Sequence, residues 1–283
     1  MQHLMHWRKN PIFELRNICF NTPNPTMRYN SMNMKTFTIL LTALILLSCK
    51  PQYHIAEMRG SITEINSSFD TPQHAAMHAL VLSYKSELDE KMNEVIATSE
   101  QAMMYGRPES LLTNFTSDVM KAYGDEQLEE GADVAMMNVH GHRASMPKGE
   151  VTVGNLFEIY SFDNAITFLE IKGSDLMELF NSYARIGGAG ISSNVRLIID
   201  NRSVKEVTID GKTIDTERIY RVVTLDYLAE GNDNMSAMRN AIKQHNTGVT
   251  LRDVMIDHVK EETRRGNPIR STLDGRITIT NQE

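Results

Sequence analysis

The sequence is poor in cysteine: it has two, Cys19 and Cys49, and both precede the part of the chain with regular apolar patterning. Two early cysteines cannot build a disulfide framework or a cysteine-rich zinc cluster in the body of the protein. The folded part must therefore be held together by its apolar core. With 283 residues, 41% of them hydrophobic, the chain can bury such a core in one large or two small domains.

Positive charge is also scarce. The chain has 29 lysines and arginines against 36 acidic residues, a net charge of −7, and no basic block. A nucleic-acid-binding protein normally needs such a block to neutralise phosphates, so we expect no nucleic-acid partner. A few converging arginines can still bind a small anionic ligand in an acidic protein.

One apolar run near the start is an exception to the otherwise mixed composition. A basic residue, Lys35, precedes the stretch Phe37–Leu47, which is too short for a comfortable membrane span and is typical of a secretory signal. The four residues Leu46–Cys49 resemble the bacterial lipobox. This resemblance implies lipidation of Cys49 and an extracytoplasmic location, anchored to a bacterial membrane. A buried apolar helix or a simple anchor remains the alternative.

The chain divides into four expected segments. Residues 1–33 show no period and are interpreted as a non-structural upstream extension, before the true start codon. Residues 34–49 are the expected lipoprotein signal peptide and residues 50–60 a linker. Residues 61–283 form one expected domain of mixed α/β (α+β) class, with mixed sheets flanked by helices, because helical patterns alternate with single strands and hairpins.

Within that domain, spacings of three and four between apolar residues predict five helices. They are expected after Pro72, from Gly106-Arg107-Pro108 to Gly124, from Gly173-Ser174, over Met235–Gln244 and over Leu251–Arg265. In the first, the apolar residues at these spacings are Met77, Leu80, Val81, Tyr84, Leu88, Met92 and Val95. The inward stripe of the second would comprise Leu111, Leu112, Phe115, Val119 and Tyr123. Strands are expected over Ala132–Val139, Ala165–Ile171, Val195–Asp200, Val204–Ile209, Tyr220–Leu225 and the final G-R-I-T-I-T, with Asp210-Gly211 as a hairpin turn.

The motif N-V-H-G-H-R, Asn138 to Arg143, contains the most conspicuous pair of polar side chains. If the segment is an extended strand end, His140 and His142 lie two residues apart on one face and could share a metal ion. The sequence places no third ligand beside them, so they are weak candidates and no metal site is predicted. A serine-nucleophile mechanism is equally unsupported, because no G-x-S-x-G motif is present.

Four segments, in order, resemble the C-terminal domain of bacterial 5′-nucleotidases and UDP-sugar hydrolases. R-P-E-S-L-L-T-N-F-T-S-D (107–118) is similar to R-x-x-E-S-x-L-G-N-x-x-x-D, and N-V-H-G-H-R to N-x-G-G-I-R. S-F-D-N (161–164) is similar to P-F-x-N. D-G-K-T-I and Y-R-V-V-T-L-D-Y-L-A-E-G-N-D-N (220–234) are similar to G-K-P-I and Y-x-V-A-x-N-D-Y-L-A-x-G-G-D-G. The resemblance covers about residues 60–283.

The resemblance implies a nucleotide-binding site. Phe162 and Tyr227 would stack on the two faces of the base, and Asn164 would contact its edge. Asp233 would accept hydrogen bonds from the ribose hydroxyls. Arg107 and Arg143 would hold the phosphate, for which a guanidinium offers two parallel hydrogen bonds. Core packing for the rings, turn capping for Asn164 and Asp233, and ordinary ion pairs for the arginines are the competing interpretations.

The sequence departs from the family pattern at several positions. His140 and His142 replace a glycine and an aliphatic residue, while Asn232 and Asn234 stand at glycine positions. Met103 occupies a place where many relatives carry a further arginine.

In the family, hydrolysis belongs to a separate metallophosphatase domain with two metals, whose D-x-H motif is absent from this sequence. The resemblance thus implies a substrate-recognition domain that is not catalytic alone and carries no cofactor. Divalent metals would belong to a separate metallophosphatase partner. The alternatives are a stand-alone nucleotide- or nucleoside-binding lipoprotein and a degenerate cell-surface interaction module.

Overall fold

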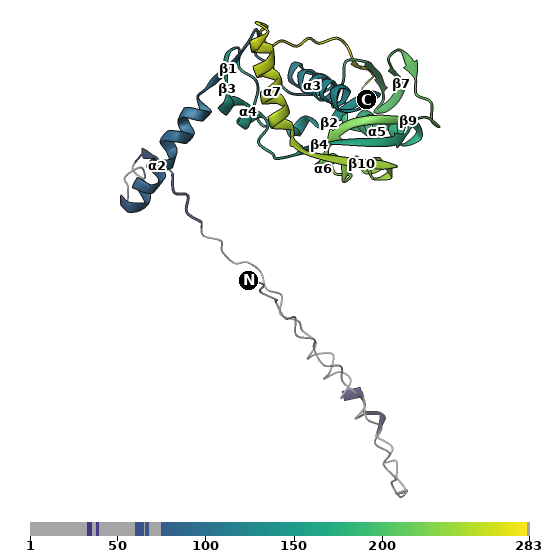
Figure 1. Ribbon diagram of the computed structural model, residues 1–283. Helices are drawn as coiled ribbons and strands as arrows, with labels where there is room; N and C mark the ends of the chain where they lie inside the picture. Colours follow the sequence, from purple (N-terminus) through teal and green to yellow (C-terminus); the bar gives the residue numbers. More distant parts are fainter. Residues whose placement is uncertain (1–32, 36–37, 40–59, 65, 68–74, 282–283) are drawn as a thin grey trace, which may run out of the picture. The chain divides into compact units, whose positions relative to one another are not determined.

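The computed structural model describes residues 33–35, 38–39, 60–64, 66–67 and 75–281 (Figure 1). The chain divides into two units, Met1–Ser68 and Phe69–Glu283. Both cysteines, most of the signal segment and nearly all of the linker lie outside the described residues, so signal cleavage and lipidation of Cys49 stay predictions. No helix in the described part is both long enough and apolar enough to cross a membrane.

The second unit is built on a five-stranded sheet with the order β10-β4-β9-β2-β5. Its strands are β2 (Val134–Met137), β4 (Ala165–Lys172), β5 (Gly190–Ile191), β9 (Ile219–Leu225) and β10 (Lys243–Thr250). The central neighbours β2 and β9 are parallel, and the other pairs are antiparallel. All four residues of β2 are buried, as expected for a strand covered on both faces. The expectation of a mixed α/β fold is confirmed.

Two smaller sheets complete the unit. The four-stranded sheet, in the order β11-β6-β7-β8, contains β6 (Val195–Asp200), β7 (Ser203–Ile209), β8 (Lys212–Thr213) and β11 (Ile277–Asn281). The two-stranded sheet contains β1 (Val95–Ser99) and β3 (Gly149–Thr152). Asp210 and Gly211 have φ angles of 51° and 71° and connect β7 to β8, which confirms the predicted hairpin turn.

The helices of this unit are α2 (Ala75–Met92), α3 (Leu111–Gln127), α4 (Val153–Ile159), α5 (Gly173–Ile186), α6 (Asp226–Ala229) and α7 (Leu251–Arg264), with short 3₁₀ turns η2 (Val139–Gly141) and η3 (Ser236–Asn240). Helices α3, α5, α6 and α7 contact the large sheet. Helix α3 contacts β2, β5 and β9, whereas α5 contacts β4 and β9. Helices α3 and α7 lie side by side (Figure 1).

Helix α3 begins and ends later than predicted. The Ser110 hydroxyl accepts a hydrogen bond from the Thr113 amide, and Thr113 bonds back to Ser110, so this capping box sets the first turn at Leu111 rather than at Pro108. Gly124 does not terminate the helix. A Cβ atom at Gly124 would lie 2.4 Å from Cγ2 of Val223, so this glycine allows α3 to approach β9 closely.

Two helix predictions need correction. Helix α2 exists, but none of its residues is buried: Leu80 and Leu88 are exposed, and Val95 belongs to β1. Apolar spacing predicts an apolar helix face, but it does not show whether another element packs against that face. The prediction of a helix over Met235–Gln244 is wrong. Within this range Ser236–Asn240 forms a 3₁₀ turn, and Lys243 already begins β10. Strand β10 is extended because its backbone N–H and C=O groups pair with those of β4.

A buried cation joins the two larger sheets. The side chain of Arg276, which precedes β11, is only 2% exposed. Its guanidinium donates to both carboxylate oxygens of Asp118 on α3, to both of Asp274, and to the carbonyl of Ile191 in β5. Three segments distant in sequence are therefore fixed to one another at this point.

Candidate functional site

The ends of three neighbouring strands meet on one side of the five-stranded sheet. Strands β2 and β9 are parallel neighbours, so the residues that follow Met137 and Leu225 emerge on the same side. Strand β4 runs antiparallel to β9 with Ile166 opposite Leu225, so the residues that precede β4 lie there too. We call the surface formed by residues 138–143, 161–164 and 226–234 the strand-end surface. It contains five of the six predicted nucleotide contacts.

Asp233 is held at this surface by two hydrogen bonds. Its Oδ1 accepts from the Tyr227 hydroxyl at 3.1 Å, and its Oδ2 accepts from Nδ2 of Asn138 at 2.7 Å. The bond to the carboxylate raises the pKa of the Tyr227 hydroxyl, which therefore stays protonated and acts as the donor. Each carboxylate oxygen keeps a free lone pair for a further donor, such as a ligand hydroxyl.

Asn232 supports the same arrangement. Its side-chain amide donates to the carbonyl of Tyr227 at 2.8 Å, a bond that the family's glycine could not make. Asn234 adopts the left-handed φ of 63° that the second replaced glycine would favour. The two asparagines are thus compatible with an ordered loop.

Phe162 and Tyr227 are 47% and 40% exposed, which rules out the interpretation that they are core aromatics. The guanidinium of Arg143 lies 5.7 Å from the centre of the Phe162 ring, a cation–π distance. Within the described part of the chain the two rings do not contact each other. Both are therefore available to stack on a planar group.

The backbone of Asn164 makes a hydrogen bond that positions the start of β4. Its carbonyl accepts a hydrogen bond from the Leu251 amide at 2.9 Å, which ties the start of β4 to the start of α7. Its half-buried side chain makes no hydrogen bond within the described residues. The amide is thus available to a ligand, and capping of its own loop is not its role.

Arg107 reaches the strand-end surface from the segment before α3. Its Nε donates to the Gly188 carbonyl at 2.9 Å, and its Nη1 lies 3.4 Å from Nε2 of His140. Gly188 lies on the same side as Asn138, since Gly190 pairs with Met137. Gly188 has φ 99°, and a Cβ atom there would lie 2.5 Å from the Pro108 carbonyl, so this close approach requires glycine.

The positive charges of the two arginines predicted to bind phosphate are not neutralised by a carboxylate within the described residues. Neither Arg107 nor Arg143 forms an ion pair with a carboxylate among the residues that the structure describes. Arg276 and Arg252, by contrast, each contact an aspartate. The interpretation of Arg107 and Arg143 as ordinary structural ion pairs is therefore wrong, and both cations can attract an anionic group.

The other weak metal candidate, His142, is a buried core residue, 1% exposed. Its Nε2 lies 2.8 Å from the Thr116 hydroxyl, which also bonds Tyr160, and its Nδ1 lies 3.2 Å from the Val139 carbonyl. Burial lowers its pKa to about 4, although the bond to Val139 acts in the opposite direction. Both ring nitrogens are engaged within the protein.

The geometry therefore does not place the two weak metal candidates where they could share one ion. His140 is exposed and directed at Arg107, while His142 points into the core. No group of three or more potential metal ligands occurs within the described residues.

Met103, at the position of a further family arginine, is fully buried and pairs through its backbone with Met146. Three residues at the site were not singled out as contacts: Asn138, His140 as a partner of Arg107, and Gly188. Asn138 opens the N-V-H-G-H-R motif, so its position was marked in the sequence. Gly188 carried no signal, because its role depends on a contact 81 residues away along the chain.

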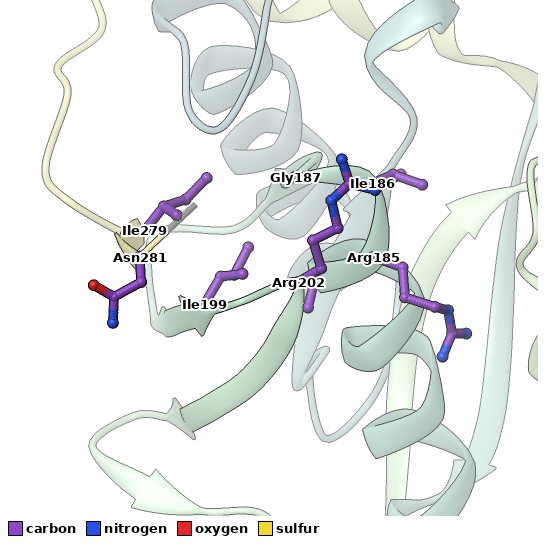
Figure 2. Close-up of a pocket in the computed structure, with 8 residues that line it drawn as sticks. Arg185, Ile186, Gly187, Ile199, Arg202, Ile279 and Asn281 are labelled. Carbon is purple, nitrogen blue, oxygen red and sulfur yellow. The ribbon is translucent and has the colours of Figure 1, made fainter. Parts of the chain in front are cut away.

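The hollow shown in Figure 2 is separate from the strand-end surface. It has a volume of about 520 Å³ and is lined by Ala184, Arg185, Ile186, Gly187, Ile199, Arg202, Ile279 and Asn281. The Arg202 side chain extends toward Ile186 and Gly187, whereas Arg185 points away and bonds to Glu178 (Figure 2). No predicted contact residue lines this hollow.

Comparison with known proteins gives a consistent result. The family model described as "5′-nucleotidase, C-terminal domain" matches residues 95–240. Protein UshA of Yersinia enterocolitica is 28% identical over 184 residues, which are 63% of this chain and 32% of that protein. The apyrase of Tabanus yao is 26% identical over an alignment of 238 positions that covers 74% of this chain and 42% of the apyrase.

Among solved structures, the 5′-nucleotidase precursor from Thermus thermophilus matches with a TM-score of 0.64 and 27% identity, covering 74% of this chain and 43% of that one. The chain thus spans between 32% and 43% of the length of these relatives.

Proposed function

The chain belongs to the 5′-nucleotidase C-terminal domain family, and from that premise we propose that its strand-end surface binds a nucleotide as the recognition half of a 5′-nucleotidase-type hydrolase system. The observation that carries the proposal is the convergence described above. Residues from the ends of β2 and β9, the start of β4 and the segment before α3 meet at one place, with Asp233 fixed between Tyr227 and Asn138.

Each group suits one part of a nucleotide. The exposed rings of Phe162 and Tyr227 are available to stack on the base, an interaction of about 1–3 kcal/mol per base that tolerates any base. The Asn164 amide, unbonded in the protein, can meet the base edge. Asp233 can accept hydrogen bonds from both ribose hydroxyls, because its two held oxygens retain lone pairs.

The phosphate would be held by Arg107 and Arg143. Both guanidiniums lack a carboxylate partner within the described residues, so a phosphate need not displace one. A guanidinium forms two parallel charge-assisted hydrogen bonds with a phosphate, which are stronger than neutral ones. Binding by these groups positions the nucleotide but does not cleave it.

Calorimetric titration with AMP tests the site directly. Wild type should bind AMP. Tyr227→Ala should weaken binding at least 10-fold, since it removes both the ring and a hydrogen bond to Asp233. Tyr227→Phe should retain the stacking part. A Tyr227→Ala variant that binds AMP as tightly as wild type would remove the stacking proposal.

Hydrolysis in this proposal requires a separate metallophosphatase, which would supply the divalent metals and the attacking water. The protein would be anchored to a membrane, outside the cytoplasm, through a lipid on Cys49. Phosphate release from AMP, measured with candidate extracytoplasmic metallophosphatases in the presence and absence of this protein, tests the partnership. An unchanged rate with every candidate, together with retained AMP binding, would indicate a stand-alone nucleotide-binding protein.

Loss of membrane association in Cys49→Ser would support the anchor, and unchanged association would exclude it.

A further inference from the structure

His140 is the one conspicuous polar residue of N-V-H-G-H-R that the proposed function leaves unused. It stands in the 3₁₀ turn η2, directly after β2, and its side chain is exposed. Its Nε2 lies 3.4 Å from Nη1 of Arg107, whose Nε is bonded to the Gly188 carbonyl. The Arg107 guanidinium is therefore fixed at two points, and its remaining N–H groups are unpaired within the described residues.

The two arginines at this surface have no carboxylate partner within the described residues. Besides Arg143, the strand-end surface carries four carboxylates, Asp163, Asp226, Glu230 and Asp233. Asp163 pairs with Arg252, so it does not neutralise Arg107 or Arg143. Asp233 already accepts from Tyr227 and Asn138. An imidazole beside an unneutralised guanidinium can serve in two ways. When neutral, Nε2 accepts a hydrogen bond from Arg107, and when protonated it donates to an anion bound between the two side chains.

We propose that His140 and Arg107 form a composite anion-binding pair that makes the strand-end surface selective for phosphorylated ligands over nucleosides. The inference rests on the proposed nucleotide-binding function and assigns His140 as a ligand contact rather than an obstruction. An imidazolium beside the Arg107 guanidinium places two positive charges side by side, and a phosphate bound against both side chains neutralises them. This part of the affinity should therefore be greater at low pH than at high pH.

The test compares AMP, adenosine and inorganic phosphate by calorimetry at pH 6 and pH 8, with wild type, His140→Gly and His140→Gln. In wild type, AMP should bind more tightly than adenosine. In His140→Gly the affinity for AMP should fall about 10-fold at pH 6 and less at pH 8, because a charge-assisted hydrogen bond is lost. Adenosine affinity should stay within about 2-fold, since the base and ribose contacts remain.

His140→Gln separates charge from shape, because glutamine keeps a donor and an acceptor but cannot carry the proton. It should retain part of the AMP affinity at pH 8 and lose the additional dependence on pH. Titration of the phosphate itself is common to all the proteins and cancels in the comparison. His78→Gln, an exposed histidine on α2, is the matched control and should change nothing.

The outcomes are distinguishable. Unchanged or tighter AMP binding in His140→Gly would overturn the inference, and tighter binding would identify His140 as a steric obstruction. Equal wild-type affinity for AMP and adenosine would overturn the inference but leave a nucleoside-binding surface. Wild type that binds neither ligand would overturn both this inference and the proposed function.

Discussion

The backbone at Asp233 and Asn234 shows how single residues shape the site. Both have left-handed φ angles, 53° and 63°, in a loop where the family pattern is rich in glycine. Aspartate and asparagine enter this region more readily than other non-glycine residues, because their short polar side chains bond locally. Asp233 bonds Tyr227 within the loop and Asn138 outside it, and Asn232 bonds the Tyr227 carbonyl. Of the two substitutions, Asn232 therefore adds a side-chain contact in the loop.

The buried His142 predicts a loss of stability in acid. Its pKa is about 4 in the folded protein and 6.5 in its ordinary state, so the unfolded chain binds more protons between these values. The free energy of unfolding should therefore fall as the pH drops from about 6.5 to about 4, by up to roughly 3 kcal/mol from this residue. Urea unfolding of wild type and His142→Gln, at a series of pH values, measures the contribution. An equal pH dependence in both proteins would contradict it.

The two histidines also show what a sequence can reveal at this scale. Two residues apart in a strand, they would lie on one face and could share a metal. The segment is instead a 3₁₀ turn with three residues per turn, so the side chains diverge: His140 to the surface and His142 to the core. The motif marked the right segment. It could not separate the two histidines, since their burial depends on α3 residues such as Thr116.

At the scale of elements, leucines of α2 and α3 differ in burial and should therefore differ in their contribution to stability. Leu112 of α3 is fully buried, whereas Leu88 of α2 is 52% exposed. Leu112→Ala should cost about 2–5 kcal/mol of unfolding free energy, because it leaves a cavity. Leu88→Ala should cost less than about 0.5 kcal/mol, since alanine is also a good helix former. Urea unfolding compares them. An equally large cost for Leu88→Ala would show that the α2 face is covered.

Long elements with strong periodicity were predictable, and short ones were not. Helix α5 and strand β6 follow their apolar patterns nearly residue for residue. The short strands β1, β3 and β5 were not expected, because two to five residues carry little periodic signal. Strand β10 was not expected either, and the helix predicted over Met235–Gln244 overlaps only its first two residues. Most of its side chains are exposed, so it has no apolar alternation, and pairing with β4 determines its conformation.

For the whole molecule, Arg276 is the main electrostatic tie between the sheets. Arg276→Met should cost about 3 kcal/mol, because Asp118 and Asp274 lose a buried partner. Arg265→Met is the matched control. Arg265 is 60% exposed and pairs with Glu261 and Glu262 on its own helix, so its loss should cost less than about 1 kcal/mol. Chemical denaturation at pH 7 measures both. Equal costs would contradict a structural role for the buried cation.

The strand-end surface and Arg107 together draw on four stretches of chain that only the assembled sheet brings together. No single hairpin or helix contains even half of it. A ligand that contacts all four stretches would therefore stabilise the assembled sheet, because unfolding of the sheet separates the groups that bind it. At about 100 times its dissociation constant, such a ligand adds roughly 2.7 kcal/mol to the unfolding free energy. Occupancy would slow amide exchange throughout β2, β4 and β9, well beyond the residues that the ligand touches.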